Sequence, residues 1–372
     1  MTSSRPFVPR PRRWPRAEPS LDWRMRAAVA LFGAARLMNA PSVRKRLELT
    51  GLSWGEIAPV LARIRTVEGW ARAFDQAADA AEKNGEFFRA AALAFLGQLI
   101  LSPFHPRKAE ITARLRRCQI QDRSARSGIR FERVVLAGGA LVGYLETPVG
   151  AHEPLVVLMP PLASIKEELT VLADPLLEAG HPVLRLDLPG QGESPPPLQV
   201  KTELLLMQAL DELGVTSEPG VLIGGISLGS YFALRLAGAD RGRVRGVFGV
   251  SPPAIITPEQ WAKQPEIIWQ YLDLYFATDA RKETLRLGMA MTLDDVVADI
   301  TCPVLLYHAA NDGISLPDRR ERYQKALAQA SLTDQVLPDT HGCTLHLKDP
   351  IAPEVVAWAG LIHRPFSRSS SA

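Results

Sequence analysis

The chain has 372 residues, enough for one large domain with an appendage or for two domains. Its net charge is only +3 and 47% of its residues are hydrophobic, which is ordinary for a globular protein and gives no overall field that would attract nucleic acid. No run of about 18 apolar residues is present, so we expect no membrane span. Cys118, Cys302 and Cys343 lie far apart, without metal-ligand spacing. We therefore expect no metal, no disulfide framework and a cytoplasmic location.

Residues 1–20 are rich in arginine and proline and contain no apolar run of the kind that a secretory signal needs. Proline at this density opposes both helix and strand, so we expect a disordered basic tail. The alternative is a tail that touches an acidic partner or a membrane surface.

Residues 21–125 show a helical pattern, and we predict a helical cap domain over this range. One apolar stripe at helical spacing comprises Ile57, Val60, Leu61 and Ile64 and continues through Val67, Trp70, Ala71 and Phe74. Further helices are expected over 86–101 and 106–119. The aromatic residues here are expected to pack between helices, and the alternative is that some face a substrate pocket.

Short apolar runs alternate with helical patterns over residues 126–372, which we predict to form a second domain. The runs that we interpret as buried strands are 155–159, 183–187, 221–223, 245–250, 304–308 and 335–337. This alternation indicates an α/β fold, with a mostly parallel sheet covered by helices on both faces. A hairpin of residues 131–136 and 140–146, joined through Gly138-Gly139, adds antiparallel strands at one edge.

One connection between predicted strands, residues 252–300, is too long for a simple crossover. Its aromatic residues are Trp261, Trp269, Tyr271, Tyr275 and Phe276. We expect this insertion to be a lid over the end of the sheet, and added core packing is the alternative.

Ser227 lies in the sequence Gly-Ile-Ser-Leu-Gly, residues 225–229. A Gly-x-Ser-x-Gly match alone is a weak signal, but this one follows a short apolar strand and begins a helical run, 228–237. In that context the serine occupies a sharp turn with its hydroxyl exposed, as the nucleophile of an α/β-hydrolase fold. A structural turn serine is the alternative interpretation.

A serine nucleophile needs a base, and the base needs an orienting acid. In this fold the acid and then the histidine follow the serine along the chain. Asp312 follows the predicted strand 304–308, and His341 follows the last predicted strand, so both should reach the edge of the sheet where Ser227 lies. We therefore predict a catalytic triad of Ser227, Asp312 and His341. The nearby competitors are Asp318 and Asp339 for the acid and His346 for the base.

An acyl-transfer mechanism also needs hydrogen-bond donors for the developing oxyanion. The backbone N–H of Leu228, directly after the serine, is the first expected donor. The second should come from the loop after residue 159, which begins Pro160-Pro161. Proline has no N–H, so Leu162 is the first residue of that loop that can donate.

With these residues in place, the chain resembles the FrsA-like branch of the α/β hydrolases. That branch includes 2,6-dihydroxypseudooxynicotine hydrolases and fungal polyketide chain-shortening hydrolases. The segments that carry the resemblance are Leu162-Ala163-Ser164-Ile165-Lys166-Glu167-Glu168, Asp187-Leu188-Pro189-Gly190-Gln191-Gly192-Glu193 and the helical N-terminal region with Trp54 and Trp70. We interpret the second segment as a structural loop. The chain departs from the branch at Pro160-Pro161, where the branch usually has Gly-Gly.

The resemblance implies a cytoplasmic hydrolase with a Ser–Asp–His triad under a helical cap and no cofactor. It would act on an ester or a ketone carbon–carbon bond of a bulky aromatic or polyketide-like small molecule. One alternative is a lyase of the same fold that eliminates an acyl group, such as acetate from an acetylated tetronate in antibiotic biosynthesis. A second is a non-catalytic regulatory binder. Association into a homodimer is left open.

Overall fold

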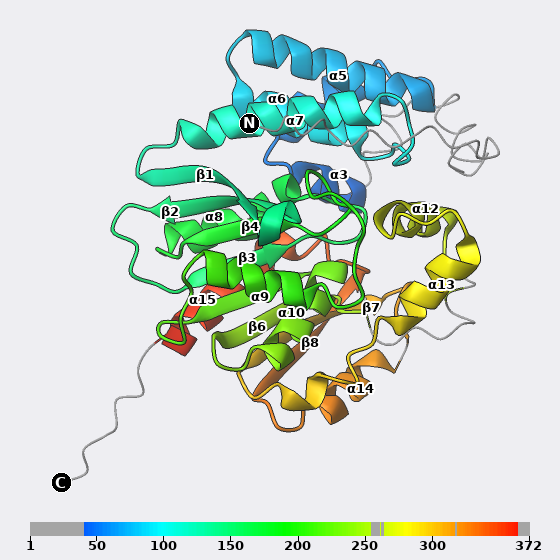
Figure 1. Cartoon of the computed structure of the whole chain (residues 1–372). Helices are drawn as coiled ribbons and strands as arrows, with labels where there is room; N and C mark the ends of the chain where they lie inside the picture. The colour runs from blue at the N-terminus through cyan, green and yellow to red at the C-terminus, as the bar shows by residue number, and fades with distance from the viewer. Residues whose placement is uncertain (1–40, 254–260, 262–263, 317, 364–372) are drawn as a thin grey trace.

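The computed structural model describes residues 41–253, 261, 264–316 and 318–363. The predicted tail, residues 1–20, and residues 21–40 of the predicted cap domain lie outside the described residues. The described chain forms an eight-stranded sheet with helices on both faces. The N-terminal helices α5 (Val67–Lys83), α6 (Phe87–Gln98) and α7 (Lys108–Ser124) lie beyond the edge of this sheet that is formed by β1 (Ile129–Leu136) (Figure 1).

The sheet has the strand order β1-β2-β4-β3-β5-β6-β7-β8. The strands are β1 (Ile129–Leu136), β2 (Leu141–Pro148), β3 (Leu155–Met159), β4 (Val183–Asp187), β5 (Val221–Ile226), β6 (Val244–Val250), β7 (Val304–Asn311) and β8 (Leu332–Thr340). Strand β2 is antiparallel to β1 and β4, and the other neighbours are parallel. This confirms the predicted hairpin and parallel sheet, although β5, β7 and β8 extend beyond the apolar runs that indicated them.

Helices cover both faces of the sheet, so its central strands are buried along their whole length. The helices of this part are α8 (Thr170–Glu178), α9 (Glu203–Glu212), α10 (Leu228–Ala239), α14 (Arg319–Ala326) and α15 (Ala352–His363). Shorter turns are η1 (Ala137–Gly139), η2 (Lys166–Leu169), η3 (Val297–Asp299) and η4 (Leu347–Ile351). One hydrophobic core joins α8 and α15 to the sheet, and another joins α9, α10 and α14 to its opposite face.

The N-terminal helices have a hydrophobic core of their own. They are α3 (Pro41–Glu48), α4 (Trp54–Leu61), α5 (Val67–Lys83), α6 (Phe87–Gln98) and α7 (Lys108–Ser124). The prediction of one continuous stripe from Ile57 to Phe74 is wrong, because α4 ends at Leu61 and a new helix begins at Val67. The side chain of Thr66 accepts a hydrogen bond from the N–H of Gly69, at 2.9 Å, and so caps the new helix.

The insertion 252–300 contains α12 (Glu266–Tyr275) and α13 (Arg281–Ala290). Its aromatic side chains are buried in the core on the α9–α10 face: Trp261, Trp269, Tyr271, Tyr275 and Phe276. Helix α12 also contacts the N-terminal helices, since Ser102 Oγ lies 3.0 Å from Gln270 Oε1. No helix within the described ranges is long and apolar enough to cross a membrane.

Candidate active site

Ser227 occupies a sharp turn between β5 and α10. Its backbone has φ 51° and ψ −112°, a left-handed conformation that non-glycine residues rarely adopt. The turn also requires close approach to β3, because a Cβ at Gly225 or Gly229 would lie 2.5 Å or 2.1 Å from the carbonyl oxygen of Met159. This is the strand–turn–helix geometry that exposes a serine hydroxyl at the edge of a sheet.

The three predicted side chains meet at this edge. Asp312 follows the end of β7, and His341 follows the end of β8. The Nε2 atom of His341 lies 2.7 Å from Ser227 Oγ, and its Nδ1 atom lies 2.9 Å from Asp312 Oδ2. Segments more than a hundred residues apart thus form one hydrogen-bonded chain, because the carboxyl ends of parallel strands share an edge.

Asp312 is held as an ionised acceptor. Its side chain is fully buried, which by itself would raise the carboxyl pKa. The hydrogen bond from His341 and the N–H groups of Ile314 and Ser315, at 2.9 Å and 3.0 Å from Asp312 Oδ1, outweigh that burial and lower the pKa to about 2. An ionised Asp312 fixes the tautomer of His341 that leaves Nε2 free to accept the serine proton.

The competing acidic residues and the competing histidine have other partners. Asp339 accepts the N–H of Leu345, at 2.7 Å, and lies 3.1 Å from Nδ1 of His346. Asp318 precedes α14 and pairs with Arg322 at 2.8 Å. Asp339 and His346 therefore brace the loop that carries His341.

Ser251 is a supporting residue that the sequence analysis did not identify. The N–H of Gly342, next to His341, donates to Ser251 Oγ at 2.9 Å. Ser251 is fully buried, has φ 49° and donates its own N–H to the oxygen of Tyr307 at 2.7 Å. Its only sequence signal is its place directly after β6, at the same edge as Ser227.

The two expected oxyanion donors lie on either side of the nucleophile turn. Leu228 is the first residue of α10, so its N–H has no partner within the helix. Leu162 follows Pro161 in the loop after β3, and Gln191 Nε2 donates to the carbonyl oxygen of Pro161 at 2.8 Å. Gln191 thereby fixes this loop, whereas donation by Leu162 to a substrate oxygen stays a prediction.

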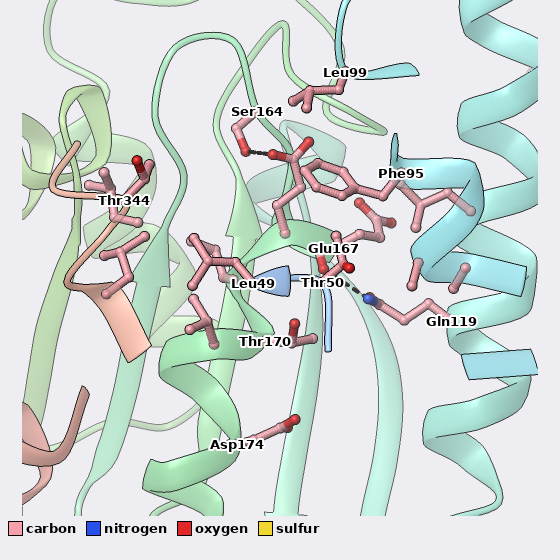
Figure 2. A pocket seen from close by; sticks show the side chains of 18 of the residues that line it. Leu49, Thr50, Phe95, Leu99, Gln119, Ser164, Glu167, Thr170, Asp174 and Thr344 are labelled. Atoms are coloured by element: carbon pink, nitrogen blue, oxygen red, sulfur yellow. Dashed lines mark hydrogen bonds between the residues drawn. The ribbon is translucent and has the colours of Figure 1, made fainter. Parts of the chain in front are cut away.

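Ser227 and His341 line a cavity of about 490 Å³. Figure 2 shows other side chains that line it, Phe95 and Leu99 of the N-terminal region among them. The N-terminal helices supply much of its apolar wall, and the side chains from that region include Leu49, Phe88, Ala91, Ala92, Phe95, Leu99 and Leu115. The opposite wall includes Pro161, Ser164, Val171, Ile226 and Leu347. Phe88 and Phe95 thus face the cavity, while Trp70 and Phe74 pack between helices. None of the described residues of 252–300 lines it, so a lid there stays a prediction.

A buried ionic cluster joins the N-terminal helices to the sheet. Lys166 Nζ lies 2.7 Å from both Asp187 Oδ2 and Glu193 Oε2. Arg116 of α7 lies 3.3 Å from Glu167 and 3.2 Å from Glu193. The segment 187–193 therefore has the structural role that the sequence indicated. Among the described residues, no group of three or more His, Cys, Asp or Glu side chains could hold a metal ion.

The chain is similar to known proteins in sequence over one segment and in structure over most of its length. Residues 154–270 match the family model of the alpha/beta hydrolase fold. The crystal structure of 2,6-dihydroxy-pseudo-oxynicotine hydrolase is similar, with a TM-score of 0.70 and 22% identity over 85% of this chain and 94% of that one. The wild-type AbyA5 structure gives a TM-score of 0.69 and 19% identity, over 91% of this chain and 98% of that one. A putative lipase from Acinetobacter baumannii AYE gives a TM-score of 0.51 and 16% identity, over 66% of this chain and 96% of that one. A search of curated proteins finds no match.

The protein thus has the α/β-hydrolase fold, with a mostly parallel eight-stranded sheet. The solved structures extend the likeness to the helical N-terminal region, since two of them align with 85% or more of the chain.

Proposed function

We propose that the protein is a serine-nucleophile hydrolase of a bulky small molecule. One observation carries the proposal: the hydrogen-bonded chain from Asp312 through His341 to Ser227, with distances of 2.9 Å and 2.7 Å, lies beside an apolar cavity. A serine hydroxyl that contacts an oriented imidazole is an activated nucleophile.

In the proposed reaction, Ser227 Oγ attacks a substrate carbonyl while His341 Nε2 takes the serine proton. Asp312 stabilises the imidazolium that forms. The N–H groups of Leu228 and Leu162 donate to the oxyanion. His341 then returns the proton to the leaving group, and water releases the acyl group from Ser227.

The cavity supports a bulky apolar substrate, an ester or a ketone carbon–carbon bond of an aromatic or polyketide-like molecule. Its volume of about 490 Å³ lies in the range of sites for drug-sized ligands. Aromatic and aliphatic side chains of α6 form one wall, where Phe95 can stack on a planar substrate. The similar 2,6-dihydroxy-pseudo-oxynicotine hydrolase is by its name a hydrolase of a small molecule, which supports this class.

The Pro160-Pro161 sequence favours a second candidate, a lyase that eliminates an acyl group. Two residues beside the nucleophile turn lack an N–H, which limits the donors available to a tetrahedral oxyanion. An elimination in which His341 abstracts a proton would form no such oxyanion. Antibiotic biosynthesis would be the setting of this candidate.

Reaction in ¹⁸O-labelled water separates the two candidates. A hydrolase places the label in the released acid, whereas a lyase releases unlabelled acid and an alkene. We expect Ser227→Ala to lose at least about 10³-fold in kcat and all labelling by a fluorophosphonate probe. Full activity in Ser227→Ala would contradict a serine nucleophile.

A further inference from the structure

A second polar pair, Ser164 and Glu168, lines the same cavity as Ser227. Ser164 Oγ donates a hydrogen bond to Glu168 Oε2, which Figure 2 marks by the dashed line at Ser164. Gln98 of α6 lies with its Nε2 atom 3.4 Å from Glu168 Oε1. Both Ser164 and Glu168 line the cavity, and Glu168 keeps part of its surface accessible there.

Glu168 differs from the carboxylates around it. Its neighbour Glu167 is fully buried and paired with Lys166 at 3.1 Å and Arg116 at 3.3 Å. The ammonium of Lys108 donates instead to the backbone oxygens of Gln98 and Leu101, at 3.2 Å and 3.3 Å, and to the hydroxyl oxygen of Tyr271, at 3.2 Å. Glu168 is therefore a cavity carboxyl whose direct contacts are neutral hydrogen-bond donors.

The protonation of Glu168 is poised near neutral pH. Burial raises its pKa to about 7, against the opposing effects of the Ser164 hydrogen bond and the Lys108 charge. The titratable groups that face it from α7, η2, β4 and α12 are Lys108, Glu167, Asp187, Tyr271 and Tyr275. A carboxyl with such a pKa can both give and take a proton at working pH.

Ser227 and His341 already suffice for the hydrolysis of a simple ester. The leaving oxygen is one atom of the breaking bond, so His341 can give its proton directly to that oxygen. A carbon leaving group is different. When its charge delocalises onto a second carbonyl oxygen, that oxygen lies away from His341 and needs a donor of its own. A separate acid in the same cavity matches that need.

We propose that Glu168 is a second proton-transfer residue of this site and that the substrate is a β-dicarbonyl compound, whose acyl group is bonded to the carbon next to a second carbonyl. The inference rests on the proposed serine hydrolase and specifies its leaving group. Ser164 acts as the residue that positions the carboxyl.

The proton transfers balance as follows. Ser227 Oγ bonds to the acyl carbon and its proton passes to His341 Nε2. The carbon–carbon bond breaks with its electron pair on the leaving group, whose carbonyl oxygen takes the proton of Glu168 to give an enol. The enol carbon takes the proton of His341, and the enol O–H returns its proton to Glu168, which yields a ketone. Water then gives a proton to His341 and its hydroxide to the acyl group, and His341 reprotonates Ser227.

The test compares two benzoyl donors, 4-nitrophenyl benzoate and dibenzoylmethane, on the full chain. Both place the same acyl group on Ser227, but only the diketone has a carbon leaving group that needs a proton. We expect Glu168→Gln to lose roughly 10²–10⁴-fold in kcat/KM on dibenzoylmethane. The loss of the same variant on the nitrophenyl ester, and in fluorophosphonate labelling, should be at least about tenfold smaller, because neither reaction needs a proton from Glu168.

Three results would overturn the inference: equal losses on both compounds, no loss on either, or a wild-type enzyme that cleaves the ester but not the diketone. Failure of the proposed function looks different, since the wild type would then resist the fluorophosphonate and cleave neither compound. A readout without substrate is the infrared carboxylic-acid band at pH 6, which should be present in the wild type and weaker in Glu168→Gln.

The pH profile distinguishes a proton donor from a structural residue. Diketone cleavage by the wild type should decline as pH rises through about 7, where Glu168 loses its proton. Ser164→Ala removes a donor that favours the carboxylate, so that decline should move to higher pH. A profile unchanged in Ser164→Ala and Glu168→Gln alike would contradict the assignment.

Discussion

His341 shows how a single side chain is fixed by contacts on two sides. Its imidazole meets Asp312 and Ser227, while the backbone of the next residue, Gly342, is tied to Ser251. The contacts of His341 with Asp312 and Ser227 could be predicted from the sequence, because the motif, the chain order and the strand ends all indicate them. Ser251 could not be predicted, since one serine after a strand has no distinguishing neighbours.

At the residue scale, we expect Asp312→Asn to lower kcat by roughly 10³–10⁴-fold. Asparagine keeps an oxygen for the N–H groups of Ile314 and Ser315 but presents its amide to His341, which favours the wrong tautomer. Steady-state kinetics on 4-nitrophenyl benzoate measures the loss. Asp318→Asn, a few residues further on, is the matched control and should stay within about twofold. Equal activities of both variants would refute the assignment of the acid.

Ser251→Ala should reduce kcat about tenfold while KM stays constant. The change leaves the Gly342 N–H buried without its acceptor, at a cost of roughly 1–3 kcal/mol, and loosens the His341 loop. Urea denaturation measures the lost stability and steady-state kinetics the lost rate. A variant with reduced stability but unchanged kcat would show that Ser251 supports the fold alone.

At the element scale, α7 connects the N-terminal helices to the sheet by charge as well as by packing. Arg116 faces the buried Glu167, whereas the adjacent Arg117 faces solvent and pairs with Glu82 at 2.6 Å. Helix periodicity predicted that α7 exists. It could not predict which of the two arginines faces the buried carboxylates, because these come from η2 and from the loop after β4.

Arg116→Leu should therefore lower the free energy of unfolding by about 3 kcal/mol, since it leaves a buried carboxylate without one of its cations. Arg117→Leu, its exposed neighbour, should cost less than about 1 kcal/mol. Chemical denaturation of both variants gives the comparison. Similar losses for the two would mean that the cluster around Lys166 tolerates the missing charge.

At the scale of the whole molecule, the mostly parallel sheet and its edge hairpin could be predicted, because buried strands and turn residues leave local signals. The strand order could not be predicted, because the pairing of distant strands leaves no local signal. The cavity could not be predicted from the sequence. Its walls come from residues as far apart as Leu49 and Leu347, and the N-terminal helices rather than the described part of 252–300 form its apolar side. The same limit applies to Ser164 and Glu168, which the sequence analysis identified only as part of a resemblance.

Acid should destabilise the whole fold through carboxylates that the native state keeps ionised. The pKa values of Asp312 and Glu167 are lowered to about 2, so their contributions are complete above the unfolded values and are lost as pH falls toward 2. Thermal unfolding should show Tm decreasing between about pH 4.5 and pH 2. Asp312→Asn should decrease less steeply over that interval, and an identical slope would contradict the assigned pKa.

The cavity walls belong to two separately cored parts of the chain, and this division has an evolutionary consequence. The proposed bond-making groups lie at the edge of the sheet, while many of the residues that line the cavity lie on α6 and α7. Substitutions in those helices can change the preferred molecule without disturbing Ser227 or His341. A single lineage of such proteins can therefore diversify in specificity while it conserves its chemistry.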